Sequence, residues 1–281
     1  MVRKLSKLSK LLISTHECKK LNILISAYAG FMCFLNLGLA ILTPHLHFSS
    51  NNIRLIRSSD RIPDKLKEQL AEIHDVSLAL AVIILHSLCL TFAGYYCFVC
   101  YCMKLYFLEF VTKSKDLILL NDYQSALQIY QELTETLIFA NGFLAYPAFI
   151  NMLCVMCGLF IFSYIFVFLP KDDFIIYVFT FGGLTIYLMS LIPMMLSGAC
   201  CNRAARQARD MIVSLPGWFP QHYTMLKMII RQKFKKKYAL TLWKTYIINE
   251  SLLMSALGTL ITYGFLIGTI GIAQGIETEK H

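Results

Sequence analysis

Five long runs that contain no Asp, Glu, Lys or Arg residue constrain this chain more than any other feature of its sequence. The runs are Leu21–Thr43, Val76–Met103, Thr136–Pro170, Phe174–Asn202 and Ser251–Ile276. Each is at least as long as the ~20 residues that carry a helix across the ~30 Å hydrocarbon core of a bilayer. With 57% hydrophobic and only 15% charged residues, the chain is also too apolar for an ordinary soluble domain. It is therefore expected to be a membrane protein.

The runs predict an all-α fold, a polytopic transmembrane helix bundle with five spans, formed by a single membrane domain over residues 1–281. The predicted spans are about 21–43, 76–103, 146–169, 174–200 and 251–275, and the predicted cytoplasmic segments are 1–20, 104–145 and 201–250. If the N-terminus lies inside, the inner segments hold 19 of the 26 Lys and Arg residues. Because basic loops stay in the cytoplasm, this bias predicts the N-terminus inside and the C-terminus outside.

Several predicted helices are too long to lie wholly within the bilayer. Thr136–Pro170 has 35 residues, which span about 52 Å in a helix, and the polar stretch Asn121–Glu135 runs into it. The second span continues beyond Met103 as a pattern too charged for lipid, and residues 203–250 carry an amphipathic pattern around Leu226 to Ile230. We therefore expect these helices to extend into the cytoplasm and to pack there as a layer.

The charge of the chain fits a membrane surface better than a nucleic acid. The formal net charge is +9, and the excess lies mainly beside the apolar runs, as in Lys233–Lys237 (KFKKK). Basic residues next to a span face the anionic lipid of the cytoplasmic leaflet. The bilayer is thus an expected partner, and nucleic acid is not.

No pattern in the sequence indicates catalysis, a metal or a cofactor. There is no glycine-rich phosphate loop, no H-E-x-x-H motif and no charged residue within the five runs. Nine of the ten cysteines lie inside the apolar runs, where packed thiols are the ordinary interpretation. The pairs Cys97/Cys100 and Cys154/Cys157 have C-x-x-C spacing but no neighbouring His or acidic residue, so we expect no metal site.

The last apolar run has two distinct faces when it is placed on a helix. Gly264, Gly268, Gly271 and Gly275 fall on one side, a seam on which another helix can pack closely. The opposite side carries small polar and apolar residues, namely Ser255, Thr259, Thr262, Leu266, Thr269 and Ala273. Such a face either lines a water-filled pore or has its hydroxyls bonded back to the carbonyl four residues earlier. The sequence leaves both interpretations open.

The other spans contain one ionisable group near mid-depth and many aromatic residues. His86 lies within the second run, and an ionisable residue at that depth is a candidate functional residue. A neutral histidine bonded across helices is the structural alternative. The third span is strongly aromatic in its outer half, Phe160 to Phe168, and these rings either pack against lipid and helices or form the wall of an apolar pocket.

The stretch Tyr238–Gly271 (YALTLWKTYIINESLLMSALGTLITYGFLIGTIG) resembles the C-terminal signature of the arthropod gustatory and odorant receptor superfamily. In that signature a short cytoplasmic helix leads through an apolar stretch into Thr-Tyr, further apolar residues and usually Gln-Phe. Thr262-Tyr263 matches it, whereas Thr269-Ile270 stands where the Gln-Phe pair would fall. The layout is similar too, with a pair of long extended helices, a tight outer turn and a large inner loop before the last helix.

The resemblance implies a plasma-membrane chemosensory receptor, a subunit of a ligand-gated cation channel that assembles as a homo- or hetero-tetramer of related subunits. Members have seven spans, so this chain would correspond to spans three to seven. The last helix would line the pore with Leu266, Thr269 and Ile270, and the helical faces above add Thr259 and Thr262. A small-molecule ligand would bind in the outer half of the other helices, in a pocket drawn by analogy from Tyr28, Phe31, Phe34, His86, Tyr164 and Tyr177.

Two other functions remain open from the sequence. The first is a truncated, non-conducting multipass protein that packs with or regulates other receptor subunits. The second is a small transporter, against which the absence of charged residues in the five runs argues, because coupled transporters keep ionisable groups at mid-depth.

Overall fold

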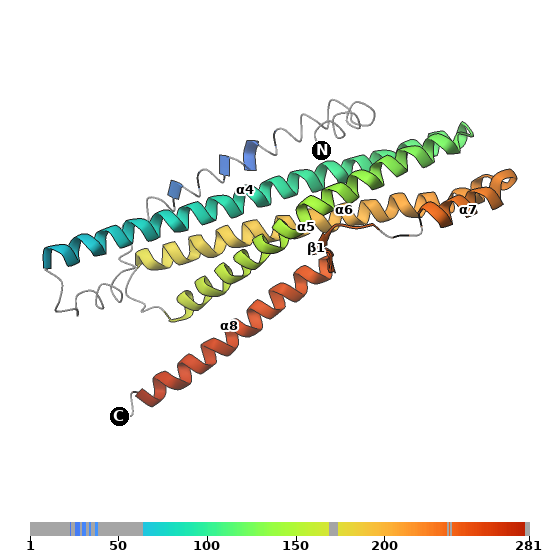
Figure 1. Ribbon diagram of the computed structural model, residues 1–281. Helices are drawn as coiled ribbons and strands as arrows, with labels where there is room; N and C mark the ends of the chain where they lie inside the picture. Colours follow the sequence, from blue (N-terminus) through green and yellow to red (C-terminus); the bar gives the residue numbers. More distant parts are fainter. Residues whose placement is uncertain are drawn as a thin grey trace. The chain divides into compact units, whose positions relative to one another are not determined.

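The computed structural model describes residues 64–168 and 174–278, apart from 235 and 237, together with single positions between Ile23 and Gly38. The described chain is almost entirely helical, which confirms the all-α prediction (Figure 1). Its elements are α4 (Asp64–Leu119), α5 (Tyr123–Phe168), α6 (Phe174–Trp218), η2 (Pro220–His222), α7 (Tyr223–Lys233), β1 (Thr241–Leu242), β2 (Tyr246–Ile247) and α8 (Glu250–Thr278). The two short strands pair antiparallel in a hairpin that was not predicted.

Helices α4, α5 and α6 are long and apolar enough to cross a membrane, which confirms a membrane protein with transmembrane helices. They correspond to the second, third and fourth predicted spans. Helix α8 covers the fifth predicted span as one continuous helix. The first predicted span and the cytoplasmic segment 1–20 lie almost wholly outside the described residues.

The three apolar helices all extend beyond a membrane span, as the sequence predicts for α4 and α5. They contain 56, 46 and 45 residues, roughly twice what a bilayer requires. Helix α4 begins at Asp64, ahead of the predicted start of its span at residue 76, and α5 begins at Tyr123, next to the start expected at Asn121. Helix α6 continues beyond the predicted end of its span at residue 200 as far as Trp218, and Pro147 and Pro193 lie inside α5 and α6 without ending them.

The described residues belong to two compact units, and α4, α5, α6 and α8 contribute to both. We call the unit made of 93–153 and 191–257 the hairpin unit, because it contains β1 and β2. The unit made of 26–92, 154–190 and 258–281 is called the aromatic unit.

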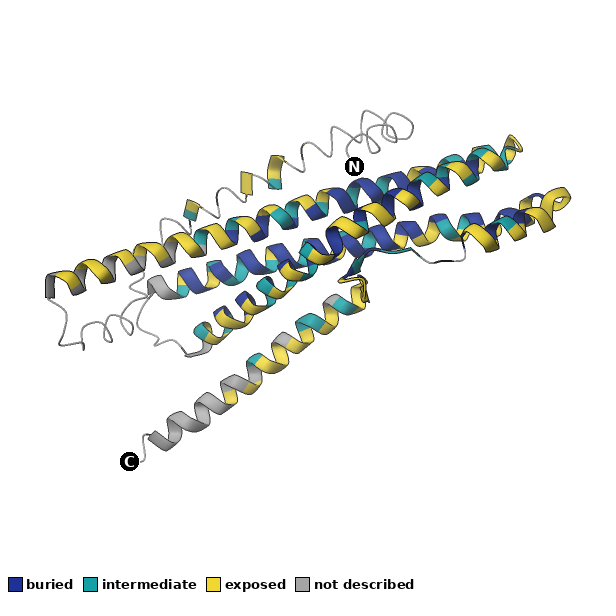
Figure 2. Ribbon diagram, in the orientation of Figure 1, coloured by how far each residue is buried: buried dark blue, intermediate teal, exposed yellow. Residues whose placement is uncertain are grey.

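The core of the hairpin unit follows from residues repeated on one face of each helix. In α4 the buried positions recur at intervals of three and four residues, the period that keeps side chains on one face. The same spacing recurs in α5 and α6, and Figure 2 shows the resulting buried stripes (dark blue). Fully buried side chains include Val99, Cys100, Met103, Phe107 and Phe110 of α4, Leu133, Leu137 and Leu144 of α5, and Leu191, Cys201, Ala208 and Ile212 of α6.

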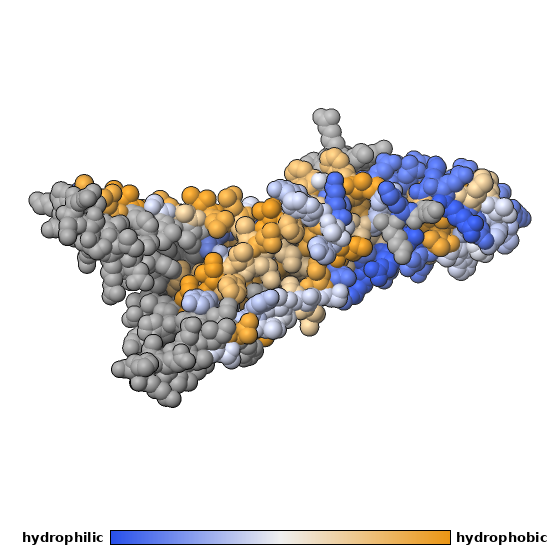
Figure 3. All heavy atoms as spheres, turned by 60° about the horizontal axis from the view of Figure 1, so that its bottom comes forward, coloured by the Kyte–Doolittle hydropathy of each residue, from blue (hydrophilic) through white to orange (hydrophobic). Residues whose placement is uncertain are grey.

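One end of the hairpin unit is polar. Figure 3 shows hydrophilic side chains (blue) gathered over α7 and the turn between α4 and α5. Lys115, Asp116, Lys227 and Arg231 are exposed there. Helix α7 buries only Leu226 and Ile230, so the amphipathic pattern of the sequence is real but Met228, on the other face, is exposed. This end has the surface expected of a segment in water.

Asp122 caps the first turn of α5. Its carboxylate accepts hydrogen bonds from the Ser125 hydroxyl (2.6 Å) and the Ser125 backbone N–H (3.1 Å). The bond from the Ser125 hydroxyl, followed by the backbone bond, lowers the pKa of Asp122 below its usual value. A carboxylate with a depressed pKa stabilises the fold above its unfolded pKa and loses that contribution as the pH falls through the folded one.

We expect Asp122→Ala to lower the melting temperature at pH 7, because the first turn of α5 loses its cap. The difference in melting temperature between the two proteins should shrink below about pH 4, because the wild-type carboxylate becomes protonated there and accepts weaker hydrogen bonds. Thermal unfolding of both proteins in detergent between pH 7 and pH 3 measures this. A difference that stays constant over that range would contradict the assigned role of the carboxylate.

Candidate functional site

A cluster of rings surrounds His86 in the aromatic unit. The His86 side chain is buried, and its ring centroid lies 4.7 Å from that of Tyr187 and 6.4 Å from that of Phe162. Phe162 also contacts Phe179 at 5.7 Å and Tyr187 at 5.7 Å. The four rings come from α4, α5 and α6 and form the core of the unit, which places the one mid-depth histidine among aromatic walls.

Two glycines make room for these rings. A Cβ added to Gly158 of α5 would lie 2.2 Å from the Tyr187 ring of α6, and one added to Gly183 of α6 would lie 2.3 Å from the Phe162 ring of α5. Each helix thus receives an aromatic ring of the other on a glycine. Because glycine has no side chain, these two positions let α5 and α6 pack closely, as small residues do between other membrane helices.

The structure places the six predicted pocket residues in different surroundings within the aromatic unit. His86 is buried in the ring cluster, and the Tyr28 hydroxyl donates to the Leu90 carbonyl of α4 at 3.3 Å. Phe34 is 74% exposed, and Phe31 and Tyr164 are also exposed. Tyr177 is half-buried and stacks edge-to-face on Phe166 at 5.9 Å. Of the two rings beside His86, Phe162 belongs to the aromatic stretch Phe160 to Phe168 whose pocket role the sequence left open, whereas Tyr187 was not predicted.

The predicted pore face of α8 is exposed. Thr259, Thr262, Leu266 and Thr269 are all exposed. The Thr262 hydroxyl donates to the Gly258 carbonyl (2.9 Å) and the Thr269 hydroxyl to the Leu266 carbonyl (2.8 Å). Both hydroxyls therefore bond back to the helix. Thr262 uses the carbonyl four residues earlier, as in the second of the two interpretations above, and Thr269 uses the carbonyl three residues earlier. Each keeps oxygen lone pairs that can still accept a bond from water.

The glycine face of α8 is described in part. A Cβ added to Gly264 would meet nothing within 4 Å, so the described residues leave this position open. Gly268, Gly271 and Gly275, and the pore candidate Ile270, lie on the continuous helix α8, but their surroundings fall outside the described residues. The predicted packing role of this face stays a prediction.

The hairpin directly before α8 is bonded to both α5 and α6. The buried side chain of Asn202 in α6 donates to the carbonyls of Leu240 (3.0 Å) and Ile248 (2.8 Å) and accepts from the Leu240 backbone N–H (2.6 Å). From α5, the side-chain amide oxygen of Asn141 accepts a hydrogen bond from the Thr241 backbone N–H at 2.7 Å. Two amide side chains therefore hold the start of β1 and the chain after β2.

The hairpin tip adds aromatic contacts. The Trp243 ring contacts the rings of Tyr146 and Phe149 of α5, with centroid distances of 5.1 and 5.0 Å. The backbone N–H of Trp243 donates to the Ala145 carbonyl at 3.2 Å. Trp243 and Lys244 adopt φ values of 51° and 58°, a left-handed conformation that costs a non-glycine residue about 1–2 kcal/mol. The bonds and stacking hold the tip in this conformation.

The start of α8 is fixed in the same region. Asn249 accepts a hydrogen bond from the Leu252 backbone N–H at 2.8 Å, as an N-cap does. Glu250, the first residue of α8, forms an ion pair with Arg203 of α6. The hairpin unit therefore determines where α8 begins.

These anchoring residues were missed in the sequence. Asn202 was only the end of an apolar run, and nothing was predicted for Asn141 or Trp243. The resemblance, in turn, implied a helix before the last span. The structure corrects that expectation: α7 is a short helix at Tyr223–Lys233, but a hairpin lies between it and α8. The one available signal was an amide residue inside an otherwise apolar helix, which in a membrane protein tends to mark an interhelical bond.

The fold and these sites define a helical membrane protein whose last helix is anchored by a hairpin. No protein-family model matches the chain, and no curated protein matches it either.

Proposed function

We propose that this protein is a chemosensory receptor subunit of the gustatory type, which forms a ligand-gated cation channel with α8 lining the pore. The observation that carries the proposal concerns helix α8: its run 251–276 has no charged residue, its small polar face is exposed, and its first residue, Glu250, pairs with Arg203 of the hairpin unit. A pore-lining helix needs a face free for water and a base that moves with the rest of the subunit.

The exposure of α8 supports assembly with further subunits. Met254, Ile261, Tyr263 and Leu266 lie on more than one side of the helix, yet each is more than half exposed. In a bilayer, lipid and neighbouring copies cover such a helix. A tetramer would surround a central pore with four α8 helices, facing Thr262, Leu266 and Thr269 toward the axis and the Gly264 side toward a neighbour.

The ring cluster supports a ligand of mainly apolar character. Small-molecule sites are usually concave, lined by aromatic side chains and fitted with a few polar groups. The aromatic unit offers the rings of Phe162, Phe179 and Tyr187 with the imidazole of His86. The proposed ligand is therefore a small molecule with an apolar body and one hydrogen-bonding group.

The proposed topology has five spans in the plasma membrane, with the N-terminus inside and the C-terminus outside. The polar end of the hairpin unit, at α7, then faces the cytoplasm and its lipid headgroups, as the distribution of basic residues favours. Glycosylation acceptor tags fused to each terminus test this arrangement. The C-terminal tag should be glycosylated and the N-terminal tag should not, and the reverse pattern would overturn the orientation.

Cysteine substitutions along α8 test the pore. Thr262→Cys, Leu266→Cys and Thr269→Cys should each make an agonist-evoked cation current sensitive to a water-soluble thiol reagent, because these positions would face the conduction path. Ile261→Cys is the matched control: it is equally exposed in the protomer but lies about 120° from the centre of the polar face. Patch-clamp recording in cells that express the full chain measures the effect, with at least about half of the current lost at the three test positions.

The outcome separates the channel from its alternative. Sensitivity at Ile261→Cys equal to that at the three test positions would remove the pore assignment. A purified protein that stays monomeric and carries no current with any related subunit would instead support the non-conducting regulatory protein.

A further inference from the structure

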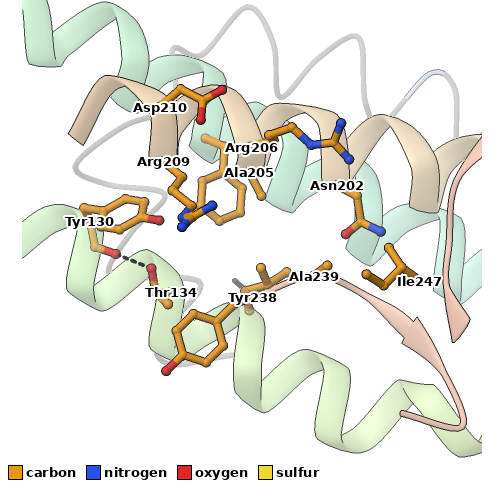
Figure 4. Close-up of a pocket in the computed structure, with 12 residues that line it drawn as sticks. Tyr130, Thr134, Asn202, Ala205, Arg206, Arg209, Asp210, Tyr238, Ala239 and Ile247 are labelled. Atoms are coloured by element: carbon orange, nitrogen blue, oxygen red, sulfur yellow. Dashed lines mark hydrogen bonds between the residues drawn. The ribbon is translucent and has the colours of Figure 1, made fainter. Parts of the chain in front are cut away.

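A cavity of about 460 Å³ opens within the hairpin unit, and none of the residues that line it belongs to the proposed ligand pocket or the proposed pore. Its walls come from α4, α5, α6 and the segment that leads into the hairpin. Phe107, Tyr130 and Tyr238 provide the aromatic part, and Arg206, Arg209 and Asp210 provide the charges (Figure 4). The volume falls within the range of small-molecule sites.

Arg209 is the group that this cavity leaves unsatisfied. Its Nε atom is buried and has no hydrogen-bond partner among the described residues. A guanidinium offers five donors and stays charged at any physiological pH, so a buried N–H without an acceptor costs free energy. Figure 4 shows the Arg209 side chain reaching from α6 toward Tyr130 of α5, while the Asp210 carboxylate points away from it. The Nε group therefore lacks an acceptor in a residue that lines the cavity.

The charge around the cavity favours an anion. Arg206 lies three residues before Arg209, on the same side of α6, and lines the same cavity, with Asp210 as the one acidic residue in its lining. Neither arginine forms an ion pair within the described part of the chain, where Arg203 pairs with Glu250 instead. Both arginines line the cavity, and a guanidinium fork matches the oxygens of a phosphate group.

We propose that this cavity binds a phosphate-bearing small molecule or lipid headgroup, with the phosphate on Arg209 and Arg206 and its ring or chain against Tyr130 and Tyr238. The site is independent of the proposed channel activity. Because Asn202 and Ile247 also line the cavity, an occupant would contact the residues that anchor the hairpin and so would bias the position at which α8 begins. In the proposed topology the cavity lies on the cytoplasmic side, where phosphorylated lipids and metabolites are both present.

Binding to the full chain, purified in detergent or in nanodiscs, tests the proposal. Inositol trisphosphate is the soluble probe, and phosphatidylinositol bisphosphate in nanodiscs of otherwise neutral lipid is the lipid probe. We expect saturable binding of at least one probe, and Arg209→Gln should weaken it by about tenfold or more, as loss of a charged hydrogen bond does. Saturation by the soluble probe identifies a free phosphate compound as the ligand, and saturation by the lipid probe alone identifies a membrane lipid.

Two further variants keep the test decisive. Arg231→Gln removes the same charge from exposed α7, outside the cavity, and should leave the affinity within about twofold, as expected for a screened surface charge. Arg209→Lys keeps the charge, so its binding should lie between the wild type and Arg209→Gln if the variant is folded, as its melting temperature reports. The proposal is wrong if neither probe saturates below about 1 mM, or if Arg209→Gln and Arg231→Gln weaken binding equally.

Discussion

Replacing Asn202 with leucine should release the hairpin from α6 and destabilise the protein by about 2–6 kcal/mol. Leucine has the same branching and number of side-chain heavy atoms, so the change removes the hydrogen bonds without leaving a cavity. The Ile248 carbonyl and the Leu240 N–H lose the partner that Asn202 gave them, and both residues are buried. The Leu240 carbonyl keeps a bond from the Ile248 N–H at 3.2 Å, so two backbone groups, at about 1–3 kcal/mol each, set the estimate.

Equilibrium unfolding in mixed detergent, followed by circular dichroism, gives the stability change. Gln207→Leu is the matched control, because Gln207 is exposed on the same helix and a surface substitution shifts stability by about 0.5 kcal/mol or less. Hydrogen exchange locates the effect: the Trp243 and Ile248 N–H groups, which are bonded in the wild type, should exchange faster in Asn202→Leu. Unchanged exchange at both amides would show that Asn202 does not hold the hairpin.

This variant also connects structure with the proposed activity. The hairpin precedes α8 directly, and α8 begins at Glu250 beside Arg203. If movement of the inner parts of α5 and α6 opens the pore, it reaches α8 through the hairpin bonds. A folded Asn202→Leu protein would then bind ligand but respond with a smaller current, whereas a change in ligand affinity alone would argue against this route.

The long helices were predictable because their signal is local. The buried residues of α4 repeat every three or four positions, and charge-free runs mark the membrane segments, so the type of all three helices and the length of α4 and α5 follow from the sequence pattern. Helix α6 continues beyond its predicted end at residue 200 to Trp218. The cap at Asp122 is local as well, since it involves Ser125 three residues away, although it was not predicted.

The hairpin was not predictable for the opposite reason. Thr241–Leu242 and Tyr246–Ile247 are strands of two residues each, too short to show alternation. Their stability comes from Asn141, which lies 100 residues from Thr241, and from Asn202, which lies 38 residues from Leu240. The Arg209 cavity depends on α4, α5 and α6 together in the same way, and no single segment predicts it.

Substitution by alanine should change the stability of the protein in opposite directions at two neighbouring glycines of α6. Gly182 has open space where a Cβ would stand, whereas a Cβ on Gly183 would lie 2.3 Å from the Phe162 ring. Alanine stabilises a helix over glycine by about 0.5–1 kcal/mol, so Gly182→Ala should be neutral or stabilising. Gly183→Ala should cost about 1–3 kcal/mol, because overpacking forces a buried ring out of place.

The ring on Gly183 has little freedom to move, which is why the penalty should appear. Phe162 is buried and already contacts His86, Phe179 and Tyr187, so a displaced ring would disturb the whole cluster. Combining Gly183→Ala with Phe162→Leu should recover part of the loss, because the smaller side chain vacates the space that the new methyl group needs. Unfolding of the single and double variants in detergent measures the coupling. Additive effects would show that the Gly183–Phe162 contact does not hold α5 against α6, and the cluster around His86 would then need another explanation for its close packing.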